Sequence, residues 1–160
     1  MPLRHRNLIA EPAVFFITTS TYNRKNFPGY PKSLVKIQQL LLQVAERKSI
    51  SIIGFVIMPN HLHLIVGSKE GGPGIARFIH SLKGMIRKQL VGNAKLWQER
   101  YDDLVLKSEK QFRIKLNYIH TNPVRAGLAA KPEDWSYSSY KDWLNQNKDS
   151  KIDFDLKVLE

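Results

Sequence analysis

The chain has 160 residues, of which 42% are hydrophobic and 10% aromatic. This composition is typical of one globular domain with its own core, and it excludes an intrinsically disordered chain. The absence of cysteine excludes disulfides, thiolate metal sites and cysteine nucleophiles, and is compatible with a reducing cytoplasm. Lysine and arginine outnumber aspartate and glutamate by 25 to 14, which gives a formal net charge of +11. A basic globular body favours nucleic acid as the partner.

The sequence carries no signal for a membrane. No stretch is apolar for long enough to span a bilayer, and the N-terminal residues lack the apolar segment of a signal peptide. We therefore expect a cytoplasmic protein. The charge balance changes near the end, where residues 145–160 carry three lysines and four acids. We expect a single domain over residues 1–144 and a polar C-terminal tail over residues 145–160.

Strand and helix patterns alternate along the first half of the chain. The segment AVFFITTSTY is β-branched and aromatic, as strands are, and apolar residues recur at helical spacing in the segment that follows. The run SIIGFVIM is apolar at nearly every position, which predicts a central strand covered on both faces. A Pro-Asn pair then predicts a tight turn into the strand HLHLIVG. These elements cover residues 13–22, 33–48, 51–58 and 61–67.

The second half of the chain predicts two helices and a short strand. Apolar and polar residues fall on opposite faces of a helix over residues 75–91. Residues 96–106 mix aromatic, acidic and β-branched residues and predict a short strand with a loop. A Ser-x-x-Gln capping box begins a third helix at residue 108, and this helix should end near residue 122 because a proline follows.

The order of these elements indicates an α+β fold. Strand, helix, strand, strand, helix, short strand and helix suggest a ferredoxin-like antiparallel sheet with helices on one face. This fold supports many functions, so the motifs must decide between them.

The stretch IMPNHLHLIV places two histidines within an apolar strand. Because strand side chains alternate, His61 and His63 project from the same face. Neutral imidazoles are common ligands of divalent metals, and a pair on a rigid strand supplies two nitrogens in fixed geometry. The alternative is a pair of hydrogen-bonded or surface histidines. A metal site would need a third ligand from another element.

The third helix carries a tyrosine and an asparagine four residues apart. Tyr118 and Asn122 share one polar face of this helix. A tyrosine is a weak nucleophile at its ordinary pKa near 10, so catalysis would need a metal that polarises the attacked group. The amide oxygen of Asn122 could complete such a metal site. The alternative is a solvated stripe on which Tyr118 covers a hydrophobic edge, and Pro123 leaves the direction of the Asn122 side chain open.

Four motifs together carry a family resemblance. The segments MPNHLHLIV, SLKG, WQERYDDLVL and YIHTNPVRAGL occur in this order between about Val14 and Ser139. They resemble the single-strand tyrosine transposases of the HUH endonuclease superfamily, especially the REP-associated tyrosine transposases. The name HUH denotes histidine, a bulky hydrophobe and histidine, which His61-Leu62-His63 matches.

The resemblance implies a reaction and a site. In this family the histidine pair binds a divalent ion, Mg²⁺ or Mn²⁺, together with a side chain from the tyrosine helix. The tyrosine attacks a DNA phosphodiester and leaves a 5′-phosphotyrosine and a free 3′-OH. By motif position, Tyr118 corresponds to the catalytic nucleophile on a C-terminal helix, and His61, His63 and Asn122 correspond to the metal ligands. The sequence departs from the family at Asp103, where many relatives carry histidine, and in its short C-terminal tail.

These expectations amount to metal-dependent cleavage and strand transfer of single-stranded, hairpin-containing DNA. The polar face of the helix at 75–91 is strongly basic and would suit the phosphates of a single strand. It carries Arg77, His80, Lys83, Arg87 and Lys88. For this helix, the alternative is a solvated face without a partner. For the protein, the alternatives are a non-catalytic nucleic-acid-binding protein or domesticated regulator, and a metal-dependent hydrolase that uses water. Relatives include homodimers in which one subunit's tyrosine serves the other's histidines, and the sequence leaves monomer and dimer open.

Overall fold

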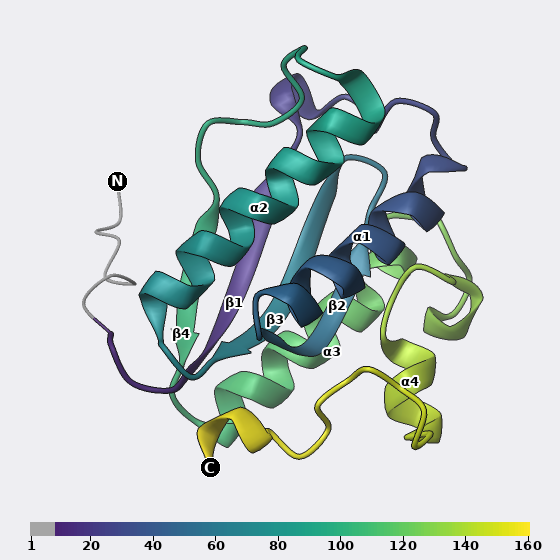
Figure 1. The fold of residues 1–160 in the computed structure, drawn as a ribbon. Helices are drawn as coiled ribbons and strands as arrows, with labels where there is room; N and C mark the ends of the chain where they lie inside the picture. The colour runs from purple at the N-terminus through teal and green to yellow at the C-terminus, as the bar shows by residue number, and fades with distance from the viewer. Residues whose placement is uncertain (1–8) are drawn as a thin grey trace.

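The computed structural model describes residues 9–160, and the basic residues of the 1–8 stretch lie outside the described part. Four antiparallel strands form one sheet in the order β2-β3-β1-β4 (Figure 1). The strands are β1 (Ala13–Ser20), β2 (Ser51–Ile57), β3 (His61–Ser68) and β4 (Asp102–Leu106). The helices are α1 (Ser33–Arg47), α2 (Gly72–Val91), α3 (Glu109–Arg125) and α4 (Tyr140–Asn145), with short 3-10 turns at Tyr22–Arg24, Pro132–Asp134 and Lys157–Leu159. The predicted α+β fold with an antiparallel sheet is confirmed.

Helices α1 and α2 cover the front face of the sheet in Figure 1 and enclose the main core. Alternate positions of β1 and β3 point into this core, among them Phe15 and Leu64, each of which is fully buried. Leu82 of α2 and Leu41 of α1 pack in the same cluster. The apolar stripes read from the sequence therefore form the interface between these two helices and the sheet.

The third helix corrects the expectation that the helices lie on one face, because α3 covers the rear face of the sheet (Figure 1). The side chains of β1, β2 and β3 that point away from α1 and α2 are also apolar and buried, as Val14, Ile53 and Ile65 show. Ile119 of α3 is fully buried against them. An apolar rear face cannot be left in water, so the third helix packs there rather than beside the first two.

Helix α3 also runs past the proline that was expected to end it. Pro123 lies inside the helix, which continues to Arg125. Its missing N–H removes one helical hydrogen bond, but the next turn still closes, because Ala126 N–H donates to Asn122 O at 3.0 Å and Leu128 N–H donates to Pro123 O at 2.8 Å. A proline so near the C-terminal end is therefore tolerated.

The C-terminal segment lies along β2, which is an edge strand. Ile57 N–H donates to Tyr137 O at 2.8 Å, and Asp153 N–H donates to Ile52 O at 2.8 Å. The stretch expected as a polar tail also places Val158, which is 2% exposed, against the rear core. These contacts satisfy backbone groups that an open sheet edge would expose. Within residues 9–160, no helix is both long enough and apolar enough to cross a membrane.

A buried hydrogen-bond cluster joins α3 to the edge of the sheet. The Oγ of Ser139 lies 2.8 Å from Nε2 of His120 and accepts from the backbone N–H of Phe55 at 2.9 Å. His120 and Ser139 are 6% and 0% exposed. Burial lowers the pKa of His120 to about 4, so the ring is neutral at pH 7 and bonds Ser139 without a charge.

The substitution Ser139→Ala should lower the free energy of unfolding by about 1–3 kcal/mol. It leaves His120 Nε2 and the Phe55 N–H buried without a partner, and an unsatisfied buried polar group carries its full desolvation cost. Urea denaturation followed by circular dichroism measures the change. Ser136→Ala is the control, because Ser136 is exposed and should shift the midpoint little. Equal effects of both substitutions would contradict the role given to the cluster.

The buried state of His120 also predicts a dependence of stability on pH. Its pKa is lowered by folding from 6.5 to about 4, so the unfolded chain binds the additional proton and stability falls as pH drops below 6.5. Between pH 7 and about pH 5 this one ring should cost about 2 kcal/mol of unfolding free energy. Urea denaturation at several pH values in EDTA should therefore give a shallower loss for His120→Gln than for the wild type. Parallel pH curves would contradict the prediction.

Candidate active site

The structure brings the two histidines together on the rear face, at the end of the sheet where β3 begins. His61 pairs with Ser20, the last residue of β1, and His63 pairs with Thr18. The two imidazole ring centroids are 4.7 Å apart. His63 is 6% exposed, whereas His61 is half-buried. The strand therefore presents two adjacent imidazoles, of which solvent reaches His61 while His63 is buried.

Hydrogen bonds orient both rings through their Nδ1 atoms. His61 Nδ1 lies 2.7 Å from Oδ1 of Asn60, and Asn60 Nδ2 donates to the carbonyl of Arg24 at 3.1 Å, which sets the orientation of the amide. His61 therefore donates from Nδ1 and keeps the lone pair of Nε2. His63 Nδ1 lies 2.8 Å from Oγ1 of Thr18. Partners of this kind hold metal-ligating histidines in a fixed tautomer and orientation.

The surroundings keep both imidazoles neutral at pH 7. Burial lowers the pKa of His61 to about 4, with a further contribution from the positive charge of Arg24. Burial lowers the pKa of His63 to about 3, and His61, Arg125, Lys115 and Arg24 lower it further. Only a neutral imidazole has the free lone pair that a metal ligand needs. Neither ring would therefore have to lose a proton at pH 7 before it could act as a ligand.

Helix α3 places Tyr118 directly beside this pair. The rings of Tyr118 and His63 meet edge to face, with centroids 5.4 Å apart. Phe16 of β1 stacks on His63 at 5.6 Å and meets Tyr118 edge-on at 6.1 Å. Tyr118 is still 40% exposed. The contacts with His63 and Phe16 thus fix the position of the Tyr118 phenol, which remains open to a substrate.

Two cations flank this phenol. The guanidinium carbon of Arg125 lies 4.5 Å from the Tyr118 ring centroid, and Lys115 Nζ lies 5.6 Å from it. Arg125 also donates to the carbonyl of Tyr118 at 2.7 Å and to the hydroxyl of Thr121. The positive charges make the mouth of the site favourable for a phosphate group.

The third predicted ligand, Asn122, lies one helical turn beyond Tyr118 and is half-buried. Among residues 9–160 there is no cluster of three histidine, cysteine, aspartate or glutamate residues that could hold a metal. The donor atoms available are therefore two imidazole nitrogens and a neutral amide oxygen. This mixed nitrogen and oxygen set fits a divalent cation.

Sequence reasoning missed several residues of the site. Thr18 and Asn60 orient the imidazoles, Phe16 packs against His63 and Tyr118, and Arg125 supplies positive charge. Asn60 stands next to His61 within the motif MPNHLHLIV, and Arg125 stands within the motif YIHTNPVRAGL that contains Tyr118, so membership of these motifs was the available signal. The contribution of β1 depends on strand pairing, which local sequence patterns do not report.

The basic residues predicted on α2 lie on the front of the molecule, on the other side of the sheet from the histidine pair. Arg77 forms an ion pair with Glu70. The Nζ of Lys83 donates to the carbonyl of Gln98 at 3.2 Å and lies 5.8 Å from the Trp97 ring centroid. The structure therefore does not bring this stripe to Tyr118. His80, Arg87 and Lys88 are exposed.

Asp103, which stands where many relatives carry histidine, is also separate from the site. It pairs across the sheet with Ile17, and the Ile17 side chain packs in the front core. Directly paired residues of neighbouring strands point to the same face, so Asp103 points away from the histidines. The departure from the family pattern therefore lies on the opposite face of the sheet from Tyr118.

Comparison with known proteins places these features in a family. The family model described as "Transposase IS200 like" matches residues 13–122, a range that includes every predicted ligand and the tyrosine. The REP-associated tyrosine transposase of Escherichia coli (strain K12) is 22% identical to this chain, over 85% of the chain and 81% of the relative. A Haemophilus influenzae protein assigned provisionally to the same class is 27% identical, over 71% of this chain and 77% of the relative.

The solved structures agree on the fold. A REP-associated tyrosine transposase bound to a REP hairpin superposes with a TM-score of 0.78 at 22% identity, covering 91% of this chain and 86% of that one. A Deinococcus radiodurans protein solved as a presumed transposase gives a TM-score of 0.52 at 18% identity, covering 71% and 92%. The family predicted from the motifs is confirmed, and with it the assignment as a transposase enzyme: the chain belongs to the IS200-like transposase family.

Proposed function

We propose that this transposase cleaves and rejoins single-stranded, hairpin-containing DNA with Tyr118 as the nucleophile. The observation that carries the proposal is the exposed phenol held edge to face against His63, 5.4 Å between ring centroids, on a strand that also presents His61. A relative of similar fold is described as bound to a REP hairpin, which supports a hairpin as the substrate.

The chemistry assigned to Tyr118 is a single displacement at phosphorus. Its phenolic oxygen forms a bond to the phosphorus of a DNA phosphodiester and gives up its proton, and the bond from phosphorus to the 3′ oxygen breaks. The departing oxygen takes up a proton and becomes a free 3′-OH, while the 5′ side stays on the protein as a phosphotyrosine. Attack of a 3′-OH on this linkage reverses the step and joins strands.

A divalent ion, Mg²⁺ or Mn²⁺, would be held by His61 and His63 through their Nε2 atoms and by the amide oxygen of Asn122. When bound, such an ion polarises the phosphate and neutralises developing charge. Asn60 and Thr18 keep the imidazoles in position, and Phe16 keeps His63 from turning. The chain itself thus supplies a rigid pair of neutral nitrogen donors.

Lys115 and Arg125 would bind the phosphate that Tyr118 attacks. Their cationic groups lie 5.6 Å and 4.5 Å from the Tyr118 ring centroid, so a phosphate that approaches the phenol meets positive charge on the same helix. Such groups hold a phosphate in line and stabilise the additional negative charge of the transition state. The five basic residues predicted on α2 would contact more distant parts of the DNA.

The substitution Tyr118→Phe should abolish a covalent protein–DNA adduct while leaving folding and DNA binding unchanged, because it removes only the nucleophilic oxygen. The measurement is a denaturing gel after incubation with labelled single-stranded hairpins from the flanks of the gene and Mg²⁺ or Mn²⁺. Tyr140→Phe is the matched control and should still form the adduct. An adduct that survives Tyr118→Phe would relocate the nucleophile, with Tyr101 and Tyr137 as the next positions to map.

Removal of the metal or its ligands should stop cleavage. EDTA, His61→Ala and His63→Gln should each abolish adduct formation, whereas Asn122→Ala should weaken Mn²⁺ binding less, since a neutral amide is the poorer ligand. Mn²⁺ titration followed by electron paramagnetic resonance measures the affinity separately from activity, and thermal melts confirm that the variants fold. Unchanged cleavage in EDTA would show that the histidines are structural.

The same experiment separates the remaining functions. Cleavage without an adduct would indicate hydrolysis by a water molecule, and DNA binding without cleavage would indicate a non-catalytic regulator. A homodimer that shares its tyrosines would show in mixtures, because His61→Ala and Tyr118→Phe subunits together would recover activity only if one subunit's tyrosine serves the other's histidines.

A further inference from the structure

A loop beside the histidine pair has features that the proposed cleavage chemistry does not use. Residues 21–27, here called the Tyr22 loop, follow β1 and contain the short 3-10 turn. Thr21 N–H donates to Asn60 O at 2.9 Å, and Phe27 N–H donates to Pro59 O at 2.7 Å. Thr21 and Phe27 are 2% and 1% exposed. The loop is therefore fixed at both ends to the turn that precedes His61.

The middle of the Tyr22 loop has an unusual backbone. Asn23 and Arg24 have φ angles of 56° and 53°, in the left-handed region that residues with side chains rarely adopt. Two side-chain hydrogen bonds hold this conformation: Asn60 Nδ2 donates to Arg24 O at 3.1 Å, and Thr21 Oγ1 donates to Lys25 O at 2.6 Å. Since Asn60 also accepts from His61, one amide connects the loop to the metal-ligand pair.

This backbone presents the Tyr22 ring to solvent. Tyr22 is 46% exposed, although it adjoins the buried Thr21. Its backbone N–H donates to Leu96 O at 2.8 Å, and Lys95 Nζ lies 4.1 Å from its ring centroid. An exposed aromatic ring on a fixed backbone, with a cation beside it, is the arrangement on which single-stranded nucleic acids stack their bases.

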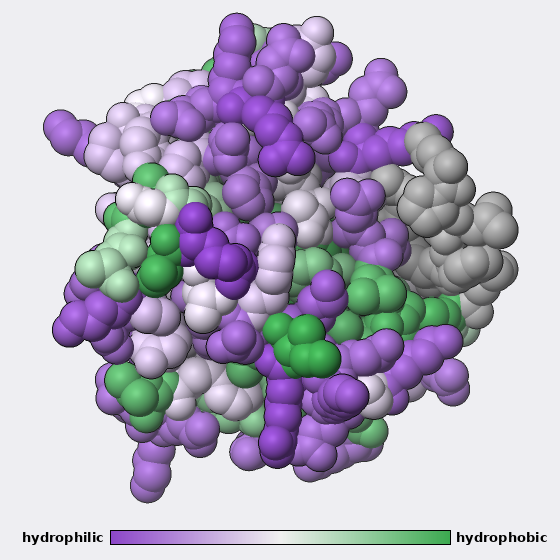
Figure 2. Space-filling view, turned by 180° about the vertical axis from the view of Figure 1, so that it is seen from behind, coloured by the Kyte–Doolittle hydropathy of each residue, from purple (hydrophilic) through white to green (hydrophobic). Residues whose placement is uncertain are grey.

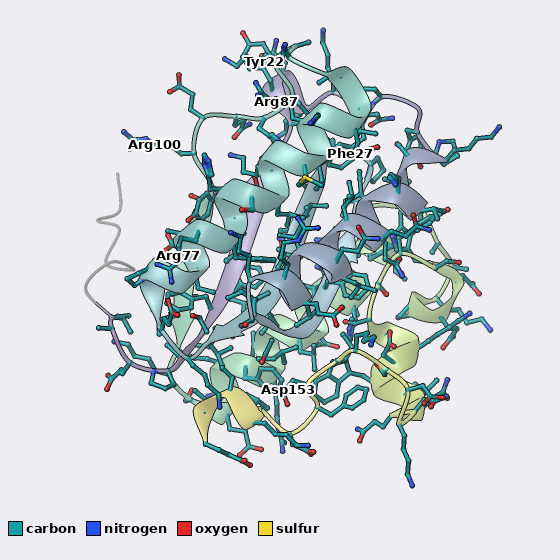
Figure 3. All side chains as sticks on the ribbon, viewed as in Figure 1. Tyr22, Phe27, Arg77, Arg87, Arg100 and Asp153 are labelled. Carbon is teal, nitrogen blue, oxygen red and sulfur yellow. The ribbon has the colours of Figure 1, made fainter. Side chains whose placement is uncertain are left out.

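The charged residues of the two stretches that meet at Tyr22 are basic. The stretches 21–30 and 92–98 contain Arg24, Lys25 and Lys95 but no aspartate or glutamate. Figure 2 shows hydrophilic side chains covering the upper end of the molecule, where this loop lies. Tyr22 and Arg87 of α2 are labelled at this same end in Figure 3, whereas Arg77 lies toward the other end of α2. Phosphates would find several cations here and no carboxylate of these stretches to repel them.

We propose that the Tyr22 loop binds the single-stranded nucleotides next to the phosphodiester that Tyr118 attacks. A base stacks on the Tyr22 ring, and Arg24 and Lys95 hold the adjoining phosphates. The inference rests on the proposed function and adds the path by which the strand leaves the active site. It assigns to this loop contacts that depend on unpaired bases and not on a particular sequence.

The test measures binding separately from cleavage. Fluorescence anisotropy in EDTA follows a labelled oligo(dT) strand and a labelled duplex of equal length. Tyr22→Ala should weaken binding of the single strand about tenfold and leave duplex binding unchanged, because the loss is one stacked base. Tyr22→Phe keeps the ring and should bind like the wild type. Leu144→Ala removes an apolar side chain of α4 that is more exposed than Tyr22, 63% against 46%, and serves as the control.

The salt dependence of binding tests the phosphate contacts of Arg24 and Lys95 separately. Replacing Arg24 and Lys95 together by Gln should reduce the slope of log K against log salt for the single strand by about 1.4, which corresponds to two phosphates. The matched pair Lys36→Gln and Lys141→Gln changes two exposed lysines on α1 and α4 and should leave the slope unchanged. Thermal melts confirm that each variant folds. Equal slopes for the two double variants would overturn the assignment of the phosphates to the Tyr22 loop.

The outcomes distinguish this inference from the proposed function. If the wild type forms the Tyr118 adduct but Tyr22→Ala binds oligo(dT) normally, the loop assignment is wrong and the cleavage mechanism stands. If Tyr22→Ala loses single-strand binding while no adduct forms on any hairpin, the loop binds single strands but the cleavage mechanism, and with it the place of the loop beside the cleaved phosphodiester, is wrong. An equal loss on single strand and duplex would overturn the stacking role.

Discussion

The site depends on the apolar character of both faces of the central strands. β1 and β3 bury alternate side chains against α1 and α2, and their remaining side chains form a second apolar surface that α3 and the C-terminal segment cover. Ile119 packs into that surface and is fully buried. Because Tyr118 precedes Ile119, the hydrophobic contact that seats the helix also brings the phenol beside His63. The position of the Tyr118 phenol is thus a consequence of core packing.

Helix α3 is attached by more than apolar contacts. Gly54 of β2 lies where a Cβ would approach Leu116 Cδ1 to 2.7 Å, so the missing side chain lets the helix come close to the sheet. His120, which follows Ile119 in α3, is joined through the buried Ser139 to the edge strand β2. Rigid support of this kind matters for a tyrosine nucleophile, since a displacement of about 1 Å from the reacting position is costly in rate.

The hydrophobic periodicities of the sequence predicted the helices and strands, and the motifs predicted the residues of the candidate site. The alternating pattern around His61 and His63 correctly predicted two imidazoles on one face, and the capping box correctly predicted the start of α3, where Ser108 Oγ accepts from Gln111 N–H at 3.1 Å. The face on which α3 packs was not predictable from its own stripe, because helical periodicity shows that a helix has a buried side and says nothing of which sheet face it meets. The basic stripe of α2 shows the same limit: its periodicity predicted a polar face but did not show that this face lies on the other side of the sheet from Tyr118.

Residues that act through strand pairing could not be found either. Thr18 and Phe16 reach His63 only because β1 pairs with β3 in one particular register. That register depends on contacts between residues about forty-five positions apart, which local patterns do not report. Asn60 adjoins His61 in the sequence, but the sequence predicted it only as a turn residue. Its side chain in fact contacts the imidazole and the Tyr22 loop.

The separation of the two basic regions constrains the path of the DNA. The cations at Tyr118 lie on the rear of the sheet, and the stripe of α2 lies on the front. A sheet is impassable to a nucleic acid strand, so a substrate that contacts both regions must pass around its edge or its end. The end at which β1 stops and β3 begins is the one that carries His61, the Tyr22 loop and the C-terminal half of α2 (Figure 3). Because Tyr22 and Arg87 both lie at this end, a strand that passes from Tyr118 to α2 around it runs past the Tyr22 loop.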